Sequence, residues 1–215
     1  MESMNADQVA ALRVLLAPTG WLDQTGAFAQ ALRRSARTPG GLLMVGTPAY
    51  EPWHMTAHLA DESRLAGIPE LEPTLVRWAP AAGAPAHLSV GLDRLAAANR
   101  RETLLVVSSY LAPPELLERV DDVRRLGTTI FALDRGDPEL DGIVHESLAI
   151  PVASAPVSFD AAQHLVSAAA SEASELSPGP RHRGLGRSRL GEDLHPGLRT
   201  RLARMLDAMT GTTAE

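Results

Sequence analysis

Short apolar runs alternate along the chain with longer segments in which apolar residues recur every three to four positions. The apolar runs predict five strands, at 42–46, 74–78, 103–109, 128–134 and 147–152. The periodic segments predict helices, at 6–16, 24–36, 52–65, 88–99, 114–126, 139–144 and 158–176. Gly67 and Gly127 each follow a predicted helix, and glycine is the usual residue just past a helix C-terminus. The elements therefore alternate regularly between strand and helix.

The strands are apolar along most of their length, and no polar residue occurs from Leu104 to Val107. Such strands are buried on both faces, and helices between them imply right-handed crossovers and a parallel sheet. The predicted fold is an α/β three-layer sandwich with a five-stranded, mainly parallel sheet of flavodoxin- or Rossmann-like topology. Ligands bind such sheets outside the carboxyl ends of the strands. Functional residues are therefore expected in the loops at 46–52 and 108–114.

The C-terminal part of the chain differs in composition from the rest. Residues 177–215 carry seven arginines against four acidic residues, whereas the whole chain has a net charge of -6. We expect helices in 1–36 that pack on the core, an α/β domain over 37–176, a flexible Arg/Gly/Pro linker over 177–195 and an amphipathic helix over 196–209. That last helix either docks on its own domain or a partner subunit, or serves as an anion-binding regulatory tail.

Two absences from the composition exclude whole classes of chemistry. The chain has no cysteine, so disulfides, thiolate nucleophiles and iron–sulfur clusters are impossible. It has no lysine, so Schiff-base catalysis and a P-loop lysine are excluded as well. The negative net charge argues against nucleic-acid binding. No apolar run is long enough to span a membrane and no signal peptide is evident, so we expect a cytoplasmic protein.

Three polar residues of the helix predicted at 52–65 share one stripe. His54, His58 and Glu62 are spaced by four residues, and each step turns only about 40° around a helix. Two histidines at this spacing can bind one metal ion, and a carboxylate one turn later can complete the site. On an exposed helix the same pair is also commonly solvated, and then it has no ligand.

Several stretches follow one another in a characteristic order. GGLLMVG enters a turn, TAHLADE lies in a helix, RRETLLVVSS opens a serine-containing loop, and FDAAQHLVSAAA forms the closing helix. This order resembles the sugar isomerase (SIS) domain family and, within it, the phosphoheptose isomerases. The resemblance spans residues 25–176. It implies a sugar-phosphate-binding protein and a site at a subunit interface, so we expect a homodimer or tetramer.

The resemblance also implies residue roles. His58 and Glu62 match the family's His-x-x-x-Glu, in which both are zinc ligands, and His164 looks similar to a further zinc ligand on the last helix. Glu62 would take a proton from the carbon next to the substrate carbonyl, and His164 would transfer protons to the oxygens as an enediol forms. The family's glutamine ligand falls on Pro156, which is a departure from the pattern.

Two loops would hold the sugar phosphate in this family. Gly46, Thr47, Ser108 and Ser109 keep the small or hydroxylated residues that such loops use to bind a dianion. Pro48 removes a backbone donor from the first loop. The second loop carries tyrosine, leucine and proline where the family has serine, glycine and serine or threonine. The phosphate-binding loops are therefore altered.

Two classes of function remain open. The first is a SIS-like sugar-phosphate-binding protein that acts as an aldose–ketose isomerase through Glu62 and His164, with zinc as its cofactor. The second is a non-catalytic SIS-fold regulatory or assembly protein that has lost the phosphate site. The histidine and glutamate stripe favours the first, and the altered loops favour the second. A dinucleotide-binding protein is a more distant alternative, because no Gly-x-Gly-x-x-Gly follows the first strand.

Overall fold

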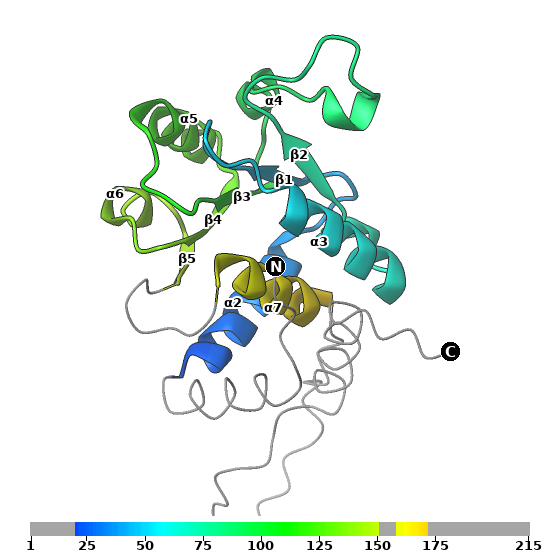
Figure 1. The fold of residues 1–215 in the computed structure, drawn as a ribbon, viewed down its shortest axis with the longest axis vertical. Coiled ribbons are helices and arrows are strands. Elements are labelled where there is room, and N and C mark those ends of the chain that lie inside the picture. Colours follow the sequence, from blue (N-terminus) through cyan, green and yellow to red (C-terminus); the bar gives the residue numbers. More distant parts are fainter. Residues whose placement is uncertain (1–19, 151–157, 172–215) are drawn as a thin grey trace, which may run out of the picture.

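A computed structural model describes residues 20–150 and 158–171 of the chain. The helices predicted at 6–16 and 196–209 and the linker predicted at 177–195 lie outside the described residues. Figure 1 shows a central sheet with helices on both faces. No helix of the described part combines the length and the apolar character that crossing a membrane requires.

The sheet has five strands, in the spatial order β2-β1-β3-β4-β5, and every neighbouring pair is parallel. The strands are β1 (Leu42–Val45), β2 (Pro73–Val76), β3 (Thr103–Val107), β4 (Thr129–Asp134) and β5 (Glu146–Ala149). The predicted α/β fold with a parallel sheet is thereby confirmed. The order reverses between β1 and β3, and in such sheets the carboxyl ends of the strands at this point flank a ligand crevice.

Alternate residues of the strands enter two separate hydrophobic cores. Leu42 and Met44 of β1 face one core, and Leu43 and Val45 face the other. The first core is covered by three helices, α2 (Trp21–Ser35), α3 (Trp53–Ala66) and α7 (Phe159–Ser171). The second is covered by α4 (Asp93–Ala96), α5 (Pro114–Arg125) and α6 (Pro138–Asp141). Helix α7 lies between α2 and α3, although it is the last described element (Figure 1).

Two residues predicted to end or begin a helix do so in the structure, one at a C-terminus and one at an N-terminus. Gly67 has a φ of 67° just after α3, and its N–H bonds to the carbonyl of Arg64. This left-handed conformation is the one in which glycine is favoured. Asp137 caps α6, because its carboxylate accepts the N–H groups of Glu139 and Leu140.

The helix predicted at 88–99 is wrong in extent. The structure has only a 3-10 turn, η3 (Ala86–Leu88), and the four-residue α4 in this region. Between them the chain makes an isolated parallel bridge with the sheet edge, in which the carbonyl of Val90 accepts the N–H of Arg77 beyond the end of β2. A second 3-10 turn, η2 (Pro69–Leu71), joins α3 to β2. Bonding to the sheet edge therefore replaces the helical bonds that the apolar spacing had predicted.

Candidate functional site

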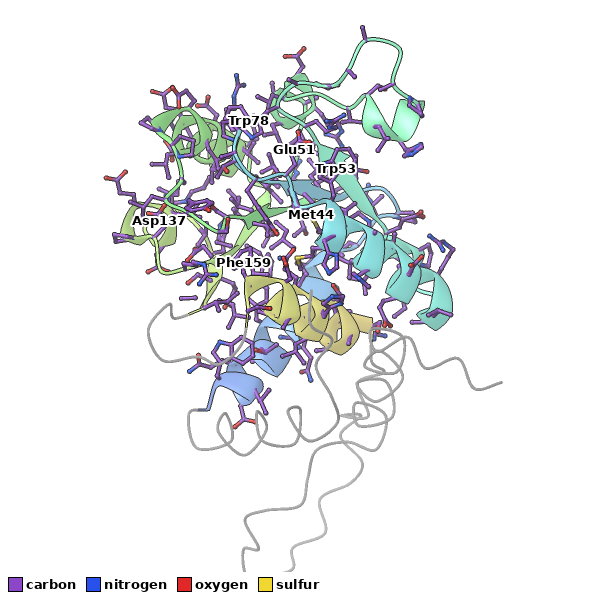
Figure 2. The ribbon with its side chains drawn as sticks, in the orientation of Figure 1. Met44, Glu51, Trp53, Trp78, Asp137 and Phe159 are labelled. Atoms are coloured by element: carbon purple, nitrogen blue, oxygen red, sulfur yellow. The ribbon has the colours of Figure 1, made fainter. Side chains whose placement is uncertain are left out.

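Helices α3 and α7 lie side by side on one face of the sheet and run in the same direction. Tyr50 hydrogen-bonds to Gln163, and His54 contacts His164. Further along both helices, Ser171 donates to Glu62. The contacts therefore follow the same order along both helices, which makes the helices parallel. Both helices begin near the carboxyl edge of the sheet, and Figure 2 shows Trp53 and Phe159 at their first turns.

Three imidazole rings meet between these two helices. The Nε2 atoms of His54 and His164 are 2.6 Å apart. The ring of His58 has its centroid 4.0 Å from that of His164 and 4.6 Å from that of His54. One ring nitrogen from each histidine lies within 4.8 Å of the others, so the three residues can hold a metal ion. Residues 110 positions apart in the chain therefore form one potential ligand set.

The environment of the three rings keeps two of them neutral. Burial, followed by the nearby rings of His58 and His54, lowers the pKa of His164 to about 3. Burial and His54 likewise lower the pKa of His58, against the opposing charges of Asp61 and Glu62. Only a neutral imidazole has a free lone pair, and this is the form that binds metals. The site is thus ready for a cation at neutral pH.

Two further observations test whether a metal fits. The Nδ1 atom of His164 is buried and has no hydrogen-bond partner among the described residues, so this ring has an unused nitrogen besides the one that faces His54. In the absence of a metal, one ring of the close pair donates an N–H and the other accepts. Two nitrogens on one tetrahedral zinc are roughly 3.3 Å apart, so the pair would have to separate by about 0.7 Å. That is within the reach of side-chain rotation, and the residues fit the group.

Glu62 lies outside this three-histidine site. Its carboxylate accepts a hydrogen bond of 2.7 Å from the hydroxyl of Ser171, one helical turn beyond His58. The assignment of Glu62 as zinc ligand and base, and of His164 as acid, stays a prediction. The stripe had indicated His54 and His58 as a possible metal-binding pair, but the ligand set implied by the resemblance had left His54 out. The four-residue spacing was a signal for it, but the choice of partner depends on how α7 packs.

The loop after β1 is closed on itself. The N–H of Thr47 bonds to the carbonyl of Tyr50, and the N–H of Tyr50 bonds back to Thr47. Gly46 is enclosed by this turn, since an added Cβ would lie 2.0 Å from the carbonyl oxygen of Tyr50. Two backbone donors that a phosphate would need are therefore already used. The Thr47 hydroxyl, in contrast, is buried and has no partner in the part of the chain that is described.

The loop after β3 is also largely satisfied. The hydroxyl of Ser108 donates to the carbonyl of Tyr110, and the N–H of Tyr110 donates back to that hydroxyl. Ser108 is fully buried, whereas the side chains of Tyr110 and Leu111 are 68% and 73% exposed. Ser109 is partly exposed. The binding roles predicted for Ser108 and Ser109 remain predictions, and binding through Ser108 would require this local bond to open.

An ion pair braces the loop after β1 against β2. The Arg77 guanidinium lies 4.4 Å from the centroid of the Trp53 ring and donates to Glu51 at 3.0 Å. The other oxygen of Glu51 accepts the N–H of Trp78, whose indole donates to the carbonyl of Gly46 (Figure 2). Arg77 is therefore neutralised, and it does not supply the positive charge that the altered phosphate loops lack.

Comparisons with known proteins concern the fold of this chain. The sequence matches no protein-family model and has no significant match among curated proteins. Among solved structures, the chain is similar to the sugar isomerase domain of the RpiR transcription factor from Sphaerobacter thermophilus. The sequence identity is 16% and the TM-score is 0.44, over 74% of this chain and 88% of that chain. The order and parallel direction of the strands define the fold of this chain.

Proposed function

We propose that this protein binds a divalent transition metal, zinc by preference, through His54, His58 and His164, and that it acts on a sugar phosphate or a related small anion. The observation that carries the proposal is the convergence of three imidazoles from two helices, two of them with lowered pKa. Nitrogen donors without thiolates are typical of zinc sites that keep one position for water or substrate. The specific activity we assign is aldose–ketose isomerisation, as the sequence resemblance implies.

The residues of the chain have distinct parts in this proposal. A bound metal would polarise the substrate carbonyl and so ease removal of the neighbouring proton. Glu62 is the base, and its carboxylate is oriented by the hydroxyl of Ser171. Thr47, at the end of β1, offers a buried hydroxyl that has no other use among the described residues. For this hydroxyl to bind a substrate oxygen, the closed turn around Gly46 would have to open.

Metal analysis tests this proposal directly. We expect about one zinc per chain in the purified protein and loss of that zinc in His58→Asn and His164→Asn. His87→Asn is the matched control, because His87 is exposed and belongs to no such cluster within residues 20–150 and 158–171. Glu62→Gln should lose turnover of heptose or hexose phosphates, and its zinc content would show whether Glu62 is also a ligand. If the protein binds no zinc and shows no thermal shift with any of these sugar phosphates, both the proposed metal binding and the proposed action on a sugar phosphate are refuted.

A non-catalytic role is the second candidate, and the closed loops favour it. Both turns at the carboxyl edge use their own hydrogen-bonding groups, as Ser108 does with Tyr110. A module that has kept some sugar-phosphate binding would give a thermal shift without turnover, and Ser108→Ala should weaken that shift, whereas an assembly protein that has lost the site would give no shift. An unchanged shift in this variant would exclude the second loop from binding. Light scattering tests the predicted dimer or tetramer under either function.

A further inference from the structure

A second polar contact joins the same two segments beside the histidine pair. The Nε2 atom of Gln163 donates to the hydroxyl oxygen of Tyr50 at 2.8 Å. Gln163 is fully buried, and it directly precedes His164. Tyr50 lies four residues before His54, just before α3 begins. The two contacts, Tyr50 to Gln163 and His54 to His164, are therefore adjacent links between the same parts of the fold.

The orientation of the Gln163 amide is determined by its neighbours. Its Nε2 atom also lies 3.3 Å from the carbonyl oxygen of Phe159 and 3.2 Å from a carboxylate oxygen of Asp160. A carbonyl and a carboxylate only accept hydrogen bonds, so the NH2 group has to face this side. The hydroxyl of Tyr50 then receives the amide hydrogen. The link is thus directional, and the Tyr50 oxygen is the nearest of the three acceptors, while Oε1 of the same amide is buried without a partner among the described residues.

Tyr50 is itself held on its own side of the link. Its backbone N–H and carbonyl are both bonded to Thr47, which leaves no room for a side chain at Gly46. Its ring packs edge-on against Phe159, with 5.6 Å between the centroids. Backbone and ring are therefore fixed independently of the hydroxyl. The hydroxyl adds one specific contact between the turn after β1 and the first turns of α7.

The histidine pair is sensitive to small displacements of these segments. One residue of an α-helix corresponds to a rise of about 1.5 Å, so a slip of α3 along α7 by one position would break the 2.6 Å contact of His54 with His164. We propose that Tyr50 and Gln163 are positioning residues that set the register of His54 against His164, so that the turn after β1 serves the three-histidine site. This inference rests on the proposed metal function and names the residues that align its ligands.

The test compares metal binding in variants of the full chain. Tyr50→Phe removes only the hydroxyl and keeps the ring on Phe159, and Gln163→Met keeps a side chain of similar length. Tyr110→Phe is the control, because Tyr110 is the other tyrosine and is 68% exposed. We expect zinc affinity, measured by competition with a chelator, to fall about tenfold or more in the first two variants, as for other residues that orient metal ligands. The double variant should lose no more than either single one, and the control should match the wild type.

A measurement of the geometry of the metal site distinguishes a positioning role of Tyr50 and Gln163 from a general effect on the stability of the protein. The visible absorption of bound cobalt(II) should change in Tyr50→Phe, at a melting temperature close to that of the wild type. Wild-type affinity and an unchanged cobalt spectrum in both single variants would overturn the inference and leave the metal site intact. If one variant does not fold, the other decides the result.

The imidazole ¹⁵N signals of metal-free protein keep the two proposals distinguishable. If the wild type binds neither zinc nor cobalt, the proposed metal function fails, and the signals of His54 and His164 then decide the positioning question. A change of these signals in Tyr50→Phe, with none in Tyr110→Phe, supports positioning of the pair. Identical signals in all three proteins would overturn it.

Discussion

Acid should destabilise this protein through His164 in the absence of metal. This side chain is only 6% exposed, and burial with its histidine neighbours lowers its pKa from 6.5 in the unfolded chain to about 3 in the folded one. Between those two pH values the His164 imidazole is protonated in the unfolded state and neutral in the folded state. The free energy of unfolding therefore falls as the pH drops below 6.5, and the loss continues until the pH approaches 3.

The size of this loss follows from the difference between the pKa values of His164 in the unfolded and the folded chain. Each pH unit between the two pKa values corresponds to about 1.4 kcal/mol, so His164 removes about 2 kcal/mol of the free energy of unfolding between pH 7 and pH 5. The lowered pKa of His58 acts in the same direction. Burial raises the pKa of Asp134, so that residue acts in the opposite direction, equally in the wild type and in a His164 variant.

Urea unfolding of the metal-free protein measures the effect as a difference. We expect the wild type to lose about 2 kcal/mol more than His164→Gln between pH 7 and pH 5. His87→Asn, which changes an exposed histidine, should lose as much as the wild type. Equal losses in the wild type and His164→Gln would show that this ring is not held neutral by burial. Added zinc should raise the free energy of unfolding at pH 7 by at least as much as at pH 5, because only neutral imidazoles bind it, so the loss should not shrink.

The turns at the carboxyl edge give two more predictions. Gly46→Ala should lower the free energy of unfolding by more than about 2 kcal/mol in urea titration, because the new Cβ would meet the carbonyl oxygen of Tyr50. Gly26→Ala in α2 has no atom within 4 Å of the new Cβ and should instead stabilise by about 0.5–1 kcal/mol, so a similar loss in both variants would contradict the steric argument. Asp137→Ala should cost about 2–3 kcal/mol by thermal or urea unfolding, since it removes the cap of α6 and leaves the buried N–H of Ala112 without its acceptor. Asp137→Asn should recover part of that loss, and a neutral Asp137→Ala would refute the capping role.

Much of the fold could be predicted because its strongest signals are local. A run such as β3, which is fully buried, is apolar at nearly every position, and this pattern has few other interpretations. The glycine after α3 and the aspartate before α6 were predictable for the same reason, since each satisfies a nearby helix end. The error at 88–99 arose where a long-range bond, from Arg77 to Val90, competes with helix formation.

The candidate site was less predictable, because packing between distant segments decides it. The spacing of His54, His58 and Glu62 shows that they share a stripe, but not which of them meets His164. The structure pairs His54 with His164 and Glu62 with Ser171. Likewise, the sequence shows that Ser108 ends a strand, but only the structure shows that its hydroxyl is bonded within the loop.

The placement of α7 between α2 and α3 has a consequence for protein synthesis. A nascent chain that has emerged as far as β5 contains all the strands that the structure describes and two of the three imidazoles, but the third arrives only with the last described helix. The proposed metal site would therefore be complete only after this helix has docked during biosynthesis. A bound ion would then mark chains in which this helix has docked in its final place.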